Sequence, residues 1–232
     1  MPGRVPPSLI VTVVLSLLVA AGAVVGAGAL RLRADRTTQA ASTSAKAANP
    51  AGSNGCLQEP CRVLGHATIA GTVIELMADA GSRSGRLSIG GTANSGWVIP
   101  ATVTDNGVVL NDDSLQCVAG GTSACLIRGV APDNRMFGQT VVGRSDSWAS
   151  GQTYVSNAGY LALANVDIDT SPEVLAAQHV CADGCATGPI RVQVFELDGS
   201  LVRCTRPYAT LERLPGYPVV KLSQADLTPC KP

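Results

Sequence analysis

Four oxygen-bearing side chains at alternate positions form the clearest candidate for chemistry in this 232-residue chain. Asn165, Asp167, Asp169 and Glu173 occupy positions 1, 3, 5 and 9 of a short polar loop. Hard cations such as calcium bind several oxygen ligands, and alternate residues of a tight loop can all point inward. The sixth position holds Thr170 instead of glycine, which makes a sharp turn harder there. These residues could form a weak calcium site, but a polar loop between two strands, with its carboxylates in water, is the favoured interpretation.

Cysteines are the second set of chemically distinctive residues, and their even number predicts disulfide bonds. Proximity in sequence favours pairing neighbours, although sequence alone leaves about 105 connectivities open. The alternative is a zinc site that uses Cys181, Cys185 and two further cysteines, but the C-x3-C spacing is unusual for zinc. The neighbouring pairs are Cys56 and Cys61, Cys117 and Cys125, Cys181 and Cys185, and Cys204 and Cys230.

No residues are assigned a catalytic role. The chain has two histidines, His66 and His179, and we interpret both as ordinary residues at strand ends. It has no G-x-S-x-G elbow and no glycine-rich nucleotide loop. Trp97 and Trp148 could stack on a sugar or a peptide, but in a chain with so few aromatic residues core packing is the favoured role.

The elements that would position these residues begin with an uncharged apolar run over 9–30. At about 1.5 Å per residue, a helix of this length spans a bilayer, so we predict a transmembrane anchor after a short tail at 1–8. A cleaved signal peptide is the alternative, because Ala27-Gly28-Ala29 fits a cleavage site. Residues 31–55 are predicted to form a flexible linker, and residues 56–232 an extracytoplasmic domain.

The orientation of this anchor rests on two opposing signals. Arg31, Arg33 and Arg36 follow the apolar run, and the positive-inside rule would place the domain in the cytoplasm. Eight cysteines favour an oxidising compartment, and long domains translocate largely regardless of flanking charge. We therefore predict a single-pass membrane protein with its C-terminal domain outside the cytoplasm, or a secreted domain if the segment is cleaved.

Short segments rich in Val, Ile and Thr, separated by turn residues, predict an all-β domain: a sandwich, a barrel or a propeller-like fold. Asp198-Gly199 predicts a hairpin. A short helix at 172–180 is an alternative to a strand at 174–180. The predicted strands are 68–77, 86–89, 97–104, 108–110, 115–119, 125–130, 139–142 and 190–197.

One local segment resembles a known family. Gly159–Ala177, GYLALANVDIDTSPEVLAA, is similar to the calcium-loop core of integrin-type β-propeller repeats of the FG-GAP and VCBS families. The resemblance extends over about 159–200 and includes the hairpin around Asp198-Gly199. It departs from the family at Asn165, where an aspartate is usual, and at Thr170, where a glycine is usual. It implies one blade-like unit with calcium held between two apolar strands.

These observations predict a binding or scaffolding module of the cell envelope, with the membrane as one partner through residues 9–30 and an envelope protein or glycan as another. An extracytoplasmic hydrolase and a purely structural surface module are the alternatives. The formal net charge is zero, which indicates no nucleic-acid partner, and no motif indicates a nucleotide. A deep polar pocket with a histidine would favour the enzyme, whereas a shallow surface with exposed apolar side chains would favour binding.

Overall fold

The computed structural model describes residues 58–90, 96–145, 147–166, 170–181 and 187–230. All of them belong to one compact unit, residues 54–232. Strands dominate these residues, as the prediction of an all-β domain requires. The strands are β1 (Arg62–Ile69), β2 (Thr72–Ala78), β3 (Gly85–Ile89), β4 (Trp97–Pro100), β5 (Leu115–Val118), β6 (Ser123–Val130), β7 (Met136–Arg144), β8 (Ser147–Ser156), β9 (Leu161–Ala164), β10 (Glu173–His179), β11 (Ile190–Phe195), β12 (Leu201–Thr205) and β13 (Leu227–Thr228).

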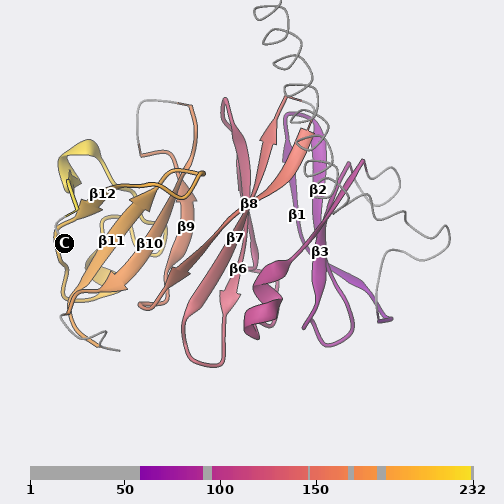
Figure 1. The fold of residues 1–232 in the computed structure, drawn as a ribbon, viewed down its shortest axis with the longest axis horizontal. Coiled ribbons are helices and arrows are strands. Elements are labelled where there is room, and N and C mark those ends of the chain that lie inside the picture. The colour runs from indigo at the N-terminus through magenta and orange to yellow at the C-terminus, as the bar shows by residue number, and fades with distance from the viewer. Residues whose placement is uncertain (1–57, 91–95, 146, 167–169, 182–186, 231–232) are drawn as a thin grey trace, which may run out of the picture. The chain divides into compact units, whose positions relative to one another are not determined.

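The strands form three antiparallel sheets in chain order (Figure 1). The first sheet is β1-β2-β3-β4, the second is β5-β6-β7-β8, and the third is β9-β10-β11-β12 with β13 at its edge. Each sheet is a meander of sequential neighbours, so most pairings are local hairpins. Three 3-10 helices join the strands: η1 (Thr102–Asn106), η2 (Leu211–Arg213) and η3 (Gln224–Asp226).

The second sheet lies between the other two, and side chains from its two faces enter separate cores. In β6, Cys125 and Ile127 pack with the first sheet, while Ala124 and Leu126 pack with the third. Side chains alternate across a strand, so a strand buried on both faces is apolar at successive positions. This is why the ACLI segment of β6 has no polar alternation.

The third sheet is also covered on both faces. Leu175, Val192 and Val194 on its far face pack against Leu214 and Val220 of the C-terminal segment. The proline-rich segment after β12 therefore closes the third core, and it brings residues 217–218 beside the second sheet.

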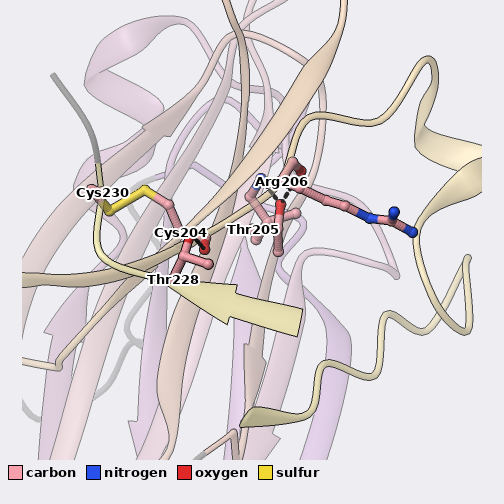
Figure 2. Close-up of a disulfide and its surroundings, with 6 residues drawn as sticks. Cys204, Thr205, Arg206, Thr228 and Cys230 are labelled. Atoms are coloured by element: carbon pink, nitrogen blue, oxygen red, sulfur yellow. Dashed lines mark hydrogen bonds between the residues drawn. A yellow bond between two sulfur atoms is a disulfide. The ribbon is translucent and has the colours of Figure 1, made fainter. Parts of the chain in front are cut away.

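The Cys204–Cys230 disulfide ties the end of this segment to β12, with Cα atoms 4.9 Å apart (Figure 2). Beside it, the Thr228 hydroxyl donates to the Cys204 carbonyl oxygen at 3.3 Å. The Thr205 hydroxyl donates to the Arg206 carbonyl oxygen at 2.8 Å. The disulfide and the Thr228 bond link β12 to the end of the chain, where β13 pairs with β12.

Several predicted elements need correction. The segment 68–77 is a hairpin and not one strand, because Ala70 and Gly71 both have positive φ (49° and 82°) and reverse the chain. The segment 97–104 ends as a strand at Pro100 and continues as η1, and residues 108–110 form no strand. The helix considered for 172–180 is wrong, because Glu173–His179 is β10 and pairs on both sides.

No helix among the described residues is long and apolar enough to cross a membrane. The predicted tail, anchor and linker, residues 1–55, lie outside the described residues.

Candidate functional site

An open cleft lies where the end of β6 meets the start of β9 and the C-terminal segment. Its volume is about 430 Å³. This is within the range of roughly 300–1,000 Å³ typical of small-molecule sites. The lining residues are Val109, Asn111, Asp113, Arg128, Gly129, Val130, Met136, Tyr160, Leu161, Tyr217 and Pro218.

Arg128 enters the cleft because of strand alternation in β6. Arg128 lies on the same face of β6 as Ala124 and Leu126, the face that packs against the third sheet. At Arg128 this apolar packing ends and the cleft begins. Its Nη1 donates to the carbonyl oxygen of Leu161 and to Oε1 of Gln116, the latter at 3.3 Å. Two bonds through one nitrogen fix the guanidinium plane against β9.

The remaining donors of Arg128 are open. Nη2 and Nε make no hydrogen bond with any residue that the structure describes. Burial lowers the pKa of the Arg128 guanidinium, and the nearby Tyr160 phenol and Asp113 carboxylate act in the opposite direction. Arginine nevertheless stays protonated at physiological pH. The cleft therefore holds a positive charge whose Nη2 and Nε donors could bind a ligand.

Gly129 brings another chain segment to this wall. A Cβ atom at position 129 would lie 2.4 Å from Cγ1 of Val108, so only glycine lets the 108–109 segment approach β6 so closely. Val109 is then left 47% exposed and Val130 49% exposed, both on the lining of the cleft. Two branched apolar side chains half in water form a surface that burial against a ligand would stabilise.

Two tyrosines also line the cleft. The ring of Tyr160 lies 6.4 Å from that of Tyr217, centroid to centroid, in a tilted arrangement. The Tyr160 hydroxyl accepts a hydrogen bond from the Val220 N–H at 3.1 Å, which leaves its own proton free to donate. Burial raises the pKa of Tyr160, so its phenol stays neutral at physiological pH.

Asp113 adds the opposite charge to the same cleft. Its backbone N–H donates to Oδ1 of Asn111 at 2.9 Å, which holds the turn before β5. Its carboxylate acts electrostatically on Arg128, yet the two groups do not form an ion pair. The ion pairs among the described residues are Asp79 with Arg86 at 2.5 Å and Asp133 with Arg135 at 2.7 Å. The Arg128 guanidinium and the Asp113 carboxylate thus line one cleft without forming an ion pair with each other.

The predicted calcium loop joins β9 to β10, and the structure describes only part of it. Asn165 is exposed, whereas Glu173 is 1% exposed and accepts a hydrogen bond from the Val166 N–H at 2.8 Å through Oε2. Glu173 therefore anchors the start of the loop. Asp167 and Asp169 lie outside the described residues. In the described parts of the chain, no group of three or more metal-ligating side chains occurs.

The end of this loop docks on the β5–β6 hairpin. The Gly121 N–H donates to the Thr170 carbonyl oxygen at 2.8 Å. A Cβ atom at Gly120 would lie 2.0 Å from the same oxygen, so the hairpin tip must be glycine there. The Gly120-Gly121 turn therefore both closes the β5–β6 hairpin and holds the loop before β10.

Two of the four predicted disulfide pairings are confirmed. Cys117 pairs with Cys125, its direct partner in the β5–β6 register, and Cys204 pairs with Cys230. Cys61 and Cys181 are also in disulfides. Because these cysteines are oxidised, they are not zinc ligands. Cys56 and Cys185 lie outside the described residues.

The remaining candidate residues are separate from the cleft. His66 lies within β1, not at its start, and is exposed; His179 ends β10, with Nδ1 3.1 Å from the Gly188 carbonyl oxygen. Trp148 is 9% exposed and packs in the first core, as expected. Trp97 is 44% exposed, so the expectation of a core role is wrong for it.

Sequence reasoning missed Arg128, which is the residue that defines the cleft. The one signal in the sequence was an arginine directly after the apolar run ACLI, where an unpaired charge requires a partner or solvent. No family model, curated protein or solved structure matches this chain.

Proposed function

We propose that this protein is a membrane-anchored, extracytoplasmic binding module whose ligand site is the Arg128 cleft. The supporting observation is that one open cleft combines two half-exposed apolar side chains, Val109 and Val130, with guanidinium donors of Arg128 that have no partner among the described residues. Binding sites are typically apolar surfaces with a few well-placed polar groups. Here the polar group is held in place by β9 before any ligand arrives.

The composition of the cleft favours binding over hydrolysis. A hydrolytic site needs a nucleophile and a base within hydrogen-bond reach. None of the cleft's lining residues is a serine, threonine, cysteine or histidine. The charged groups present, Arg128 and Asp113, can hold a ligand but supply no nucleophile–base pair.

The location outside the cytoplasm is supported by the oxidised cysteines. Thiols of cytosolic proteins stay reduced, whereas Cys61, Cys117, Cys125, Cys181, Cys204 and Cys230 are all in disulfides. The apolar run at 9–30 supplies the anchor, and the linker holds the domain away from the bilayer. An envelope peptide, protein or glycan fragment is then the accessible partner. A membrane-impermeant protease should degrade the domain in intact cells; degradation only after lysis would contradict this location.

The binding function is tested by comparing two substitutions of exposed valines. Small amphipathic compounds are screened for those that raise the melting temperature of the full chain in detergent micelles. Val130→Glu places a charge on the cleft wall, while Val202→Glu places one on β12, at a position 39% exposed and outside the cleft. Compounds that stabilise the wild type should not stabilise Val130→Glu but should still stabilise Val202→Glu. Equal stabilisation of both variants would contradict the assignment of the cleft.

A further inference from the structure

The geometry points to a small zwitterion, an α-amino acid with an apolar side chain, as the ligand of the Arg128 cleft; this inference rests on the proposed binding function. An α-amino acid carries a carboxylate, an ammonium group and a side chain on one carbon. The cleft offers a partner for each of these three groups.

The carboxylate partner is the Arg128 guanidinium. Because Nη1 is already bonded to Leu161 and Gln116, the group cannot swing out to follow a ligand. Its Nη2 and Nε atoms make no hydrogen bond with other described residues, and these two donors form one edge of the planar fork. That edge matches the two oxygens of a carboxylate, and such charge-assisted pairs are among the strongest hydrogen bonds in proteins.

The ammonium partner is the Asp113 carboxylate. It lines the same cleft as Arg128 and acts on it electrostatically, but the two are not within the 4.0 Å of an ion pair. A ligand with one charge would satisfy one of these groups and would be repelled by the other. A zwitterion placed between them satisfies both, so the charge pattern selects against simple anions and simple cations.

The side-chain partner is the apolar part of the lining. Val109 and Val130 are about half exposed, and Met136 and Leu161 line the cleft beside them. Methionine adapts to ligands of different shape, and the branched residues favour aliphatic contact. A leucine-like side chain would remove this surface from water, which is the main favourable contribution to burial.

The experiment uses three isosteric probes with the full chain in detergent micelles. Isothermal titration calorimetry compares L-leucine, which has both charges, with 4-methylpentanoate, which lacks the ammonium group, and 3-methylbutylamine, which lacks the carboxylate. L-leucine should bind about tenfold more tightly than either single-charge probe, since each lost charge-assisted bond costs about a factor of ten. Equal affinity of 4-methylpentanoate and L-leucine would overturn the inference.

Two variants test which side chain binds the ammonium group of the ligand and which binds its carboxylate. Asp113→Asn should abolish the advantage of L-leucine over 4-methylpentanoate, while Asp112→Asn, at an exposed neighbour outside the cleft, should retain it. Arg128→Lys should lower the affinity for both L-leucine and 4-methylpentanoate and leave the affinity for 3-methylbutylamine unchanged. An unchanged L-leucine advantage in a folded Asp113→Asn variant would overturn the role of Asp113.

These outcomes separate the inference from the proposed function. If 4-methylpentanoate binds in the cleft as well as L-leucine, the binding function stands and the zwitterion assignment fails. If no probe binds and the screen also finds no compound that stabilises the wild type but not Val130→Glu, the binding function itself fails.

Discussion

The side-chain amide of Gln116 pairs with the main chain of Leu163 as a neighbouring strand would. Nε2 of Gln116 donates to the Leu163 carbonyl oxygen at 2.9 Å, and Oε1 accepts from the Leu163 N–H at 3.1 Å. Gln116 lies in β5 of the second sheet and Leu163 in β9 at the edge of the third. Gln116 therefore satisfies two main-chain groups on the open edge of the third sheet, and Arg128 satisfies the Leu161 carbonyl oxygen beside them. Such an edge could otherwise pair with a strand of another chain.

Two further glutamines connect the sheets in the same way. Gln139 of β7 accepts from the N–H of residue 102 at 2.7 Å and donates to the carbonyl oxygen of residue 100 at 3.1 Å. Gln178 of β10 accepts from the N–H of residue 157 at 3.2 Å and donates to the carbonyl oxygen of residue 155 at 2.6 Å. Gln139 and Gln178 meet the main chain at the end of an edge strand, and Gln116 meets it within one. The three sheets are therefore fixed by hydrogen bonds as well as by apolar packing.

Replacement of Gln116 by leucine should destabilise the domain strongly for its size. The variant loses three hydrogen bonds, two with Leu163 and one from Arg128, and leaves the N–H and carbonyl of Leu163 without partners. Together these losses should cost about 2–4 kcal/mol. The free energy of unfolding from urea titration measures this loss. The matched control is Gln152→Leu, because Gln152 is exposed in β8 and should change stability by about 0.5 kcal/mol or less. Similar losses in the two variants would contradict the bridging role of Gln116.

Replacement of Gly120 by alanine should disrupt the docking of the loop before β10. The added Cβ would lie 2.0 Å from the Thr170 carbonyl oxygen, a backbone atom that cannot move without displacing the loop. Overpacking of this kind costs about 1–3 kcal/mol. Hydrogen exchange at Gly121, whose N–H bonds to Thr170, should accelerate together with the loss of stability. Gly96→Ala is the control, since nothing lies within 4 Å of its added Cβ; equal behaviour of the two variants would exclude a docking role for Gly120.

Calcium binding by Asn165, Asp167, Asp169 and Glu173 remains a prediction. Titration of calcium to about 10 mM, above the weakest extracellular sites, should raise the melting temperature of the chelated protein. The linkage gain is about 0.4 kcal/mol at one dissociation constant and about 2.7 kcal/mol at one hundred. The rise should vanish in Asp167→Ala and persist in Asp105→Ala. An unchanged melting curve in the wild type would make the loop an ordinary polar turn.

Tyr154 should make the domain less stable in strong base. Burial, followed by the charge of Asp198, raises its pKa to about 12 from an ordinary value near 10. Its hydroxyl donates to the Glu196 carbonyl oxygen at 2.7 Å, and the residue is 5% exposed. Since the unfolded state loses the proton first, this stabilisation is full below pH 10 and is lost as the pH rises through about 12. The loss is of the order of 2–3 kcal/mol.

The measurement is the free energy of unfolding at pH 9.5 and at pH 11.5. Tyr154→Phe should be less stable than the wild type at pH 9.5, through the lost hydrogen bond, but should have a shallower decline with pH. Tyr160, whose pKa burial also raises, supplies the remaining decline in that variant. A decline of the same steepness in both proteins would show that Tyr154 does not titrate with folding.

The fold class and the local disulfides could be predicted because they depend on nearby residues. Cys117 and Cys125 flank a glycine turn, and a hairpin places them opposite each other. The hairpin at Asp198-Gly199 is present for the same reason. By contrast, β8 was missed because its sequence, SWASGQTYVS, is polar and mostly exposed; it is a strand because β7 supplies main-chain partners.

The cleft could not be predicted because its residues come from distant parts of the chain. Arg128 on β6 and Tyr217 in the C-terminal segment meet only after the third sheet has packed on the second. The turn at Ala70-Gly71 was missed for a local reason. A tight hairpin usually has asparagine and glycine at its turn, but here alanine stands in place of asparagine. Alanine is unexpected there because positive φ costs it about 1–2 kcal/mol.

The binding claim is tested most directly by amide NMR of the isotopically labelled full chain in micelles during titration with L-leucine. The largest shift changes should fall on the amides of residues 109–113, 128–130 and Tyr217, which belong to three separate segments that meet at the cleft. Residues 201–202, whose side chains are also exposed and apolar, should remain unchanged. Changes centred on 201–202 or 97–98, or no saturable change anywhere, would contradict the account.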